Sequence, residues 1–142
     1  MFKHVLIPTD GSALSTEAAS KSIELAGSHG ARATALVVLE PLPAGGRHSE
    51  AMRAEHESRA DAEADAVLAA IAMRAKAAGV DLATRKARGD DPYAAIIRAA
   101  EEQGCDVIAM ASHGRRGDAA MVLGSQTLKV LTHSKVPVLV FR

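Results

Sequence analysis

Short, continuous apolar runs alternate with longer segments of helical periodicity along this chain, and no other feature of the sequence restricts the fold as strongly. Runs of this kind are typical of parallel strands, because both faces of such strands are buried. Strict alternation of strand and helix implies right-handed crossovers, with helices on both faces of the sheet. The sequence therefore predicts an α/β fold: a three-layer open sheet of five parallel strands in a single domain, residues 1–142.

The expected elements follow one another without a linker, a repeat or a low-complexity segment. The strands are expected at residues 2–7, 34–39, 80–88, 106–111 and 136–141. The helices are expected from Ser12 to Gly27 or Gly30, within 47–78, at 93–103 and from about 124 to 133. The segment 80–88 is polar enough for an edge strand, and the first half of 47–78 is charged enough to be a solvated helix face.

The composition excludes several classes of partner. Seventeen basic residues balance seventeen acidic ones, and aromatic residues make up only 2% of the chain. Electrostatic attraction to nucleic acid or to an anionic membrane is therefore not expected, and base stacking on aromatic rings is almost unavailable. No apolar run approaches the roughly 20 residues that span a bilayer. The lone Cys105 cannot form an intramolecular disulfide, so a cytoplasmic protein is expected.

Two loops are candidates for a ligand site. In open α/β sheets, ligands bind beyond the carboxyl ends of the strands, where the strand order reverses. One loop is Pro8–Ser12, after the first strand, and the other follows Ala111, after the fourth strand. The second loop contains Gly114 and Gly117 and leads to Gly124 at the start of a helix, where free backbone N–H groups could meet a phosphate. On spacing alone, an ordinary glycine-rich turn explains these residues equally well.

Other chemistries have little support in the sequence. The patterns G-x-x-x-x-G-K-[ST], G-x-G-x-x-G, H-E-x-x-H and G-x-S-x-G are all absent. Hydrolysis by a P-loop, a zinc site and a serine nucleophile are accordingly not predicted. His113 lies in the second loop, where a structural hydrogen-bonding role is favoured over contact with a phosphate.

Three segments in register resemble the universal stress protein family over essentially the whole chain. They are Lys3–Ser12, Met110–Gly117 and the ending from Gly124 to Val140. The resemblance implies the strand order 3-2-1-4-5, a homodimer paired through the last strand and, in one branch, the binding of ATP. That branch carries G-x2-G-x9-G-[ST], of which this chain has Gly114, nine further residues, Gly124 and Ser125. Ala111 replaces the first glycine, which costs little if its φ is negative.

The resemblance also implies a role for each site residue. Pro8, Thr9 and Asp10 would line the adenosine pocket, and Val38 would contact the base. Gly114, Gly124, Ser125 and Gln126 would face the phosphates, and Ala111 completes the expected binding set.

The resulting functional hypothesis is a stress-response regulatory protein, a dimeric module that binds ATP with Mg²⁺ or Mn²⁺. Nucleotide would act by changing the order of the Pro41–Arg47 loop or the dimer surface. A slow ATP hydrolase is one alternative, although only Asp10 and His113 are candidates for a general base. A nucleotide-free dimeric interaction protein is the other.

Overall fold

The five parallel strands form one sheet in the order β3-β2-β1-β4-β5 in the computed structural model, which describes residues 1–115, 117 and 122–142. The strands are β1 (His4–Pro8), β2 (Arg32–Leu39), β3 (Leu82–Arg88), β4 (Val107–Ala111) and β5 (Val138–Phe141). All the pairings are parallel. Both the predicted α/β class and the predicted strand order are confirmed.

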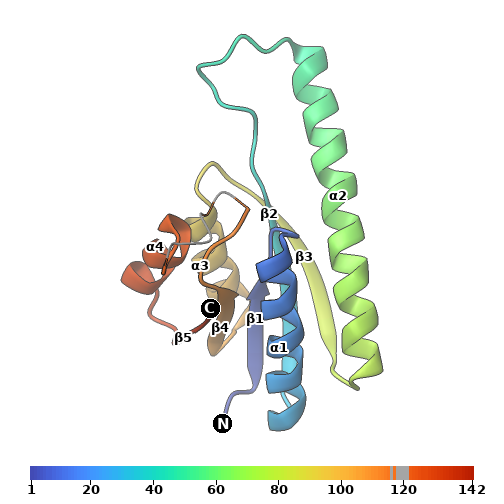
Figure 1. Ribbon diagram of the computed structural model, residues 1–142, viewed down its shortest axis with the longest axis vertical. Coiled ribbons are helices and arrows are strands. Elements are labelled where there is room, and N and C mark those ends of the chain that lie inside the picture. The colour runs from blue at the N-terminus through green and yellow to red at the C-terminus, as the bar shows by residue number, and fades with distance from the viewer. Residues whose placement is uncertain (116, 118–121) are drawn as a thin grey trace.

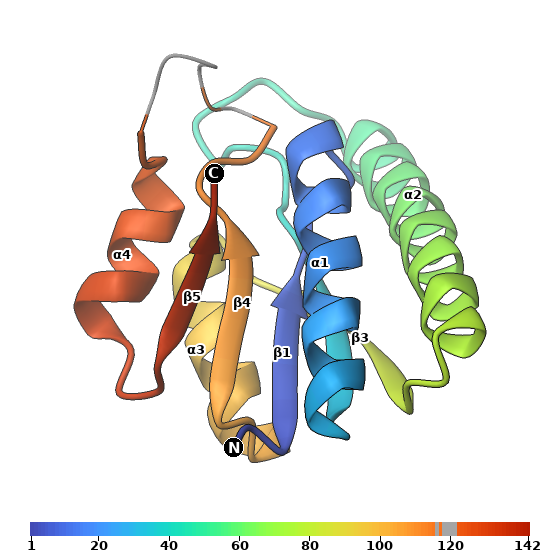
Figure 2. The same ribbon diagram turned by 60° about the horizontal axis from the view of Figure 1, so that its bottom comes forward.

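Helices cover both faces of this sheet (Figures 1 and 2). The helices are α1 (Ala13–His29), α2 (Glu50–Ala77), α3 (Pro92–Gln103) and α4 (Ser125–His133). Side chains alternate across the central strands, so Val5 and Ile7 of β1 join the core under α1 and α2. Leu6 joins the core on the opposite face, under α3 and α4. The chain thus has two apolar layers on the two sides of one sheet.

The helix ends follow the sequence signals closely. The Ser12 side chain accepts a hydrogen bond from the Ser15 N–H at 3.3 Å and so caps α1. Gly30, rather than Gly27, ends this helix in the left-handed conformation. The predicted start of β5, at residue 136, is two residues too early, since the strand begins at Val138. Pro137 lacks an N–H group, so only its carbonyl joins the sheet, as acceptor for the Ile108 N–H.

The long helix α2 rests on the sheet with only part of its length. Its buried residues begin at Ala64 and continue through Leu68, Ile71 and Ala75. Residues 50–63 lie mostly past the end of the sheet and adjoin the loop that arrives from β2 (Figure 1). Ala60 still packs against the core, and Asp61 pairs with Lys86 of β3 at 2.9 Å. This arrangement confirms the prediction that the charged first half is largely a solvated face. Among the described residues, no helix has both the length and the apolarity needed to cross a membrane.

His4 is a buried titratable group at the amino end of β1, far along the strand from the candidate loops. It is 5% exposed, and its Nε2 lies 2.7 Å from Thr34 Oγ1. Its Nδ1 is buried and has no hydrogen-bond partner within the described part of the chain. Burial, together with the charge of Arg32, lowers the pKa of His4, so the folded protein favours the neutral ring.

This histidine should make the stability of the protein depend on pH. The unfolded chain takes up the proton at a higher pH than the folded chain does. The free energy of unfolding should therefore fall as the pH drops below about 6.5, by at most about 1.4 kcal/mol per pH unit. Urea unfolding between pH 8 and pH 5 measures this slope. In His4→Gln, whose amide can still bond Thr34 but does not titrate, the slope should be smaller; an unchanged slope would contradict the assignment.

Candidate functional site

The loops that follow β1 and β4 meet at the carboxyl edge of the sheet. These two strands are neighbours, and the chain continues from β1 to β2 on one side but enters β4 on the other. The strand order therefore reverses here, where open α/β sheets bind ligands. The Arg115 N–H donates to Asp10 Oδ2 at 2.6 Å, and the Arg115 guanidinium donates to the Asp10 carbonyl at 2.7 Å. These two hydrogen bonds join the loops directly.

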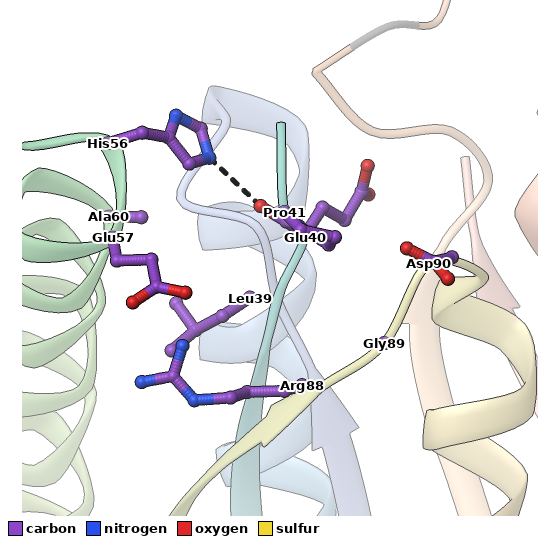
Figure 3. Close-up of a pocket in the computed structure, with 9 residues that line it drawn as sticks. All are labelled: Leu39, Glu40, Pro41, His56, Glu57, Ala60, Arg88, Gly89 and Asp90. Carbon is purple, nitrogen blue, oxygen red and sulfur yellow. Dashed lines mark hydrogen bonds between the residues drawn. The ribbon is translucent and has the colours of Figure 1, made fainter. Parts of the chain in front are cut away.

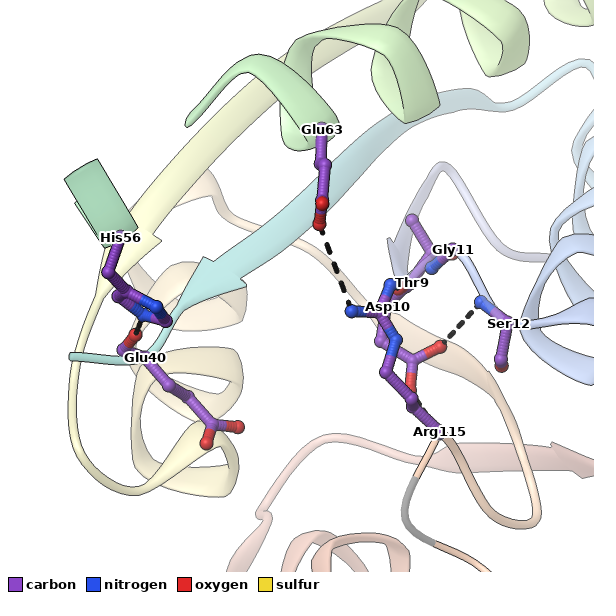
Figure 4. A network of polar contacts seen from close by, with 8 residues as sticks. All are labelled: Thr9, Asp10, Gly11, Ser12, Glu40, His56, Glu63 and Arg115. Carbon is purple, nitrogen blue, oxygen red and sulfur yellow. Dashed lines mark hydrogen bonds and ion pairs between the residues drawn. The ribbon is translucent and has the colours of Figure 1, made fainter. Parts of the chain in front are cut away.

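Asp10 is the centre of this network (Figure 4). Its Oδ1 accepts hydrogen bonds from the Ser12 N–H at 2.9 Å and from Ser15 Oγ at 2.8 Å. Burial on its own would raise the pKa of Asp10, but the hydrogen bonds from Ser12, Arg115 and Ser15 outweigh it and hold the pKa below its usual value. Asp10 is therefore an ionised, fully engaged carboxylate that fixes two loops.

Two partners of this network were not predicted from the sequence. Ser15 is 4% exposed and forms hydrogen bonds with Asp10 and Thr9. It could have been predicted as a partner of this loop, because it lies three residues after the N-cap residue Ser12. Glu63 Oε2, from α2, lies 3.9 Å from Arg115 Nη1, and both side chains are exposed (Figure 4). No sequence pattern connects Glu63 with a loop fifty residues away, so only the fold could show this contact.

Gly114 packs against the Asp10 carboxylate. A Cβ built on Gly114 would collide with Asp10 Oδ2, and the Asp10 carboxyl carbon would lie only 3.2 Å from it. Any side chain at this position would therefore push the two loops apart. The predicted glycine is needed here for close approach.

The start of α4 lies at the same edge. Gly124 is the N-cap residue, and its N–H donates to the Ser112 carbonyl at 2.6 Å, which places the helix start beside the end of β4. A Cβ on Gly124 would lie 3.0 Å from the His113 Cβ, so this position too is closely packed. The first-turn N–H groups of a helix have no acceptor within the helix, and the helix dipole is positive there. Because glycine supplies no capping side chain, these groups suit an anion.

The other predicted residues take various places. Pro8 and Thr9 are buried at the end of β1, and Val38 is partly buried on the α3 and α4 face of β2. Ser125 is exposed in the first turn of α4, near the loops described above. Ala111 ends β4, and its carbonyl accepts a hydrogen bond from Thr127 Oγ1 at 3.0 Å. Among the described residues only glycines have positive φ, so the methyl group of Ala111 causes no backbone strain.

Gln126 makes a contact that the sequence did not indicate. Its Oε1 accepts a hydrogen bond from the Tyr93 N–H at 2.9 Å, in the first turn of α3. Asp91 is the N-cap residue of α3, but its side chain makes no capping hydrogen bond within the described residues. Gln126 therefore supplies the acceptor that satisfies the start of α3, and its role toward phosphate stays a prediction.

Comparison with known proteins agrees with this architecture. The model of the universal stress protein family matches residues 1–142. The universal stress protein MJ0531 of Methanocaldococcus jannaschii is 30% identical over 142 residues, which are 100% of this chain and 83% of that protein.

Solved structures are similar over the same length. The universal stress protein UspA of Lactobacillus plantarum is 26% identical with a TM-score of 0.82, over 99% of this chain and 97% of that one. A universal stress protein solved in complex with cAMP is 27% identical with a TM-score of 0.75, over 99% of this chain and 97% of that one. With a family match over the full length and the same fold, the chain belongs to the universal stress protein family.

Proposed function

We propose that this protein is a regulatory binding module for an adenine nucleotide, ATP with Mg²⁺ or Mn²⁺, held at the carboxyl edge between β1 and β4. The observation that carries the proposal is the start of α4. Its first-turn N–H groups face the loop edge without a capping side chain, next to closely packed Gly114 and Gly124. The cAMP-bound relative supports an adenine nucleotide as the class of ligand.

Most of the predicted residues have a direct role in this proposal. Gly124, Ser125 and Gln126 would hold the phosphates through backbone N–H groups and the Ser125 hydroxyl. Val38, at the end of β2, would contact the base. Asp10 would hold the adenosine-facing loop in place, with Pro8 and Thr9 forming its base.

Calorimetric titration of the nucleotide-free protein tests the proposal. ATP with Mg²⁺ should give saturable binding, and cAMP should be titrated separately because the two nucleotides share the base but differ in phosphate charge. Tighter binding of ATP than of cAMP would support the phosphate-binding role of α4. If neither nucleotide binds, the proposal fails and a dimeric interaction protein becomes the better description.

We propose further that the protein is a cytoplasmic homodimer in stress responses, paired through β5. This edge strand consists of Val138, Leu139, Val140 and Phe141, and Leu139 is 37% exposed. An exposed apolar edge strand readily pairs with another copy.

Leu139→Arg should convert the dimer to a monomer, because it places a charge in the centre of the proposed strand pair. Light scattering after size-exclusion chromatography measures the mass. Met73→Arg is the matched control, since Met73 is 74% exposed on α2 and lies outside β5. Equal masses for the two variants would argue against pairing through β5.

A further inference from the structure

A cavity lies at the carboxyl edge of the sheet, between α2 and the ends of β2 and β3 (Figure 3). Its volume is about 220 Å³. Leu39, 7% exposed, and Ala60 give it an apolar floor. His56 closes one side, because its Nε2 lies 2.9 Å from the Glu40 carbonyl and ties α2 to the chain that leaves β2. Val38 belongs to the opposite face of β2, so this cavity is separate from the proposed nucleotide site.

Arg88 is the cation of this cavity. Even-numbered residues of β3 face α2, and Lys86, two residues earlier, is bound to Asp61 and Asp65 at 2.9 and 2.7 Å. The Arg88 side chain makes no hydrogen bond or ion pair within the part of the chain that the structure describes, although its charge helps to lower the pKa of Asp61. Figure 3 shows its guanidinium directed into the space beside α2. A guanidinium in this position suits a carboxylate, which it can bind through two parallel hydrogen bonds.

Carboxylates line the same cavity. Glu57 extends from α2 into the space that Arg88 also faces, and Asp90 follows Arg88 and Gly89 along the chain (Figure 3). An anion alone would be repelled by these acidic groups, and a cation alone would leave Arg88 without a counter-charge in the cavity. A molecule with both an anionic and a cationic group satisfies both sets of charges.

We infer that this cavity binds a small zwitterion of the α-amino acid class. The ligand carboxylate pairs with Arg88, the ammonium group lies toward Glu57, and an aliphatic side chain rests on Leu39 and Ala60. The volume admits a molecule of this size but not a whole nucleotide.

Three matched probes test this inference on the full chain by amide chemical-shift titration. The probes are L-norvaline, butylamine, which lacks its carboxylate, and pentanoate, which lacks its ammonium group. Norvaline should shift the amides of Glu57, Ala60, Gly89 and Asp90 saturably, and each single-charge probe should bind at least about tenfold more weakly. Equal affinity for norvaline and butylamine, or the absence of saturable shifts with norvaline, would overturn the inference.

Variants on the same strand complete the test. Arg88→Gln should weaken norvaline binding at least about tenfold, whereas Arg85→Gln should leave it unchanged. Arg85 is an exposed arginine of β3 that does not line this cavity. Glu57→Gln provides a second loss variant on another element. Gly124→Asp should bind norvaline as the parent does, so failure of the nucleotide proposal and failure of this inference are distinguishable. If Arg88→Gln binds norvaline with the affinity of the parent, the assignment is refuted.

Discussion

Gly124→Asp should weaken ATP binding roughly 100-fold relative to the parent protein. The new carboxylate would occupy the first-turn N–H groups of α4 and place a negative charge where the phosphates are proposed to lie. One such charge about 5 Å from one phosphate charge costs about 3 kcal/mol at an effective dielectric constant near 20, or roughly 100-fold in affinity. Calorimetric titration of both proteins with ATP and Mg²⁺ measures the difference.

Two further substitutions separate charge from shape at this position. Gly124→Asn occupies the same N–H groups with a neutral side chain, and Gly124→Ala adds only a Cβ, 3.0 Å from the His113 Cβ. Binding should weaken in the order Ala, Asn, Asp. Because Asp is a good N-cap residue, the Asp variant should remain folded, which thermal unfolding verifies. If Gly124→Asp binds ATP as the parent does, the phosphates do not lie at α4.

Asp10→Ala should be the more damaging change for stability. It removes the acceptor of three hydrogen bonds, which come from Ser12, Ser15 and Arg115. Ser12 lies in the β1 loop and Ser15 in the first turn of α1, whereas Arg115 belongs to the β4 loop. For a partly buried carboxylate this should cost about 2–4 kcal/mol and lower the Tm by on the order of 10 °C. In Asp10→Asn, the amide oxygen can still accept from Ser12, but the amide nitrogen cannot accept from Arg115. The free energy of unfolding of this variant should lie between those of the parent and Asp10→Ala. Urea unfolding at pH 7 ranks the three proteins.

The pH dependence gives an independent check of this network. Because the pKa of Asp10 is lower in the folded protein, its stabilising contribution is complete above the unfolded pKa of about 3.9. That contribution is lost as the pH falls through the folded pKa. The difference in stability between the parent and Asp10→Ala should therefore shrink below pH 4. A difference that stays constant into strong acid would show that the charge of Asp10 is not what holds the loops.

The sequence predicted the architecture well because its strands are buried on both faces. Val5-Leu6-Ile7 and Val107–Ala111 have no polar interruption, and such runs leave little alternative to central parallel strands. The strand order could not be predicted in this way, because no local sequence pattern determines it. It was predicted from the resemblance to a family. The start of α1 was predictable because one residue, Ser12, determines it. Its end was narrowed only to Gly27 or Gly30, since either glycine can adopt the left-handed conformation.

The candidate site was only partly accessible from the sequence. Asp10 and Gly114 were predicted as neighbours of a ligand, but their contact with each other depends on how two loops pack across the sheet. Gln126 was expected to face phosphates, and its hydrogen bond to the start of α3 depends on the angle between two helices. No sequence pattern marked Glu63 or Arg88 as a site residue, because charged residues are common on solvated helices and on edge strands.

The overhanging half of α2 has a mechanical consequence. Residues 50–63 extend about 20 Å beyond the first fully buried residue, Ala64, at 1.5 Å per residue. The Glu63–Arg115 contact lies at the base of this overhang, next to the loops at the carboxyl edge. A tilt of about 5° near Ala64 would carry the tip nearly 2 Å. The same tilt would move His56, about 12 Å along the helix, by about 1 Å, and His56 would pass that movement to the chain that leaves β2 through its contact with the Glu40 carbonyl. A displacement too small to notice beside Arg115 would become measurable, in spin-label distances, at the far end near Met52.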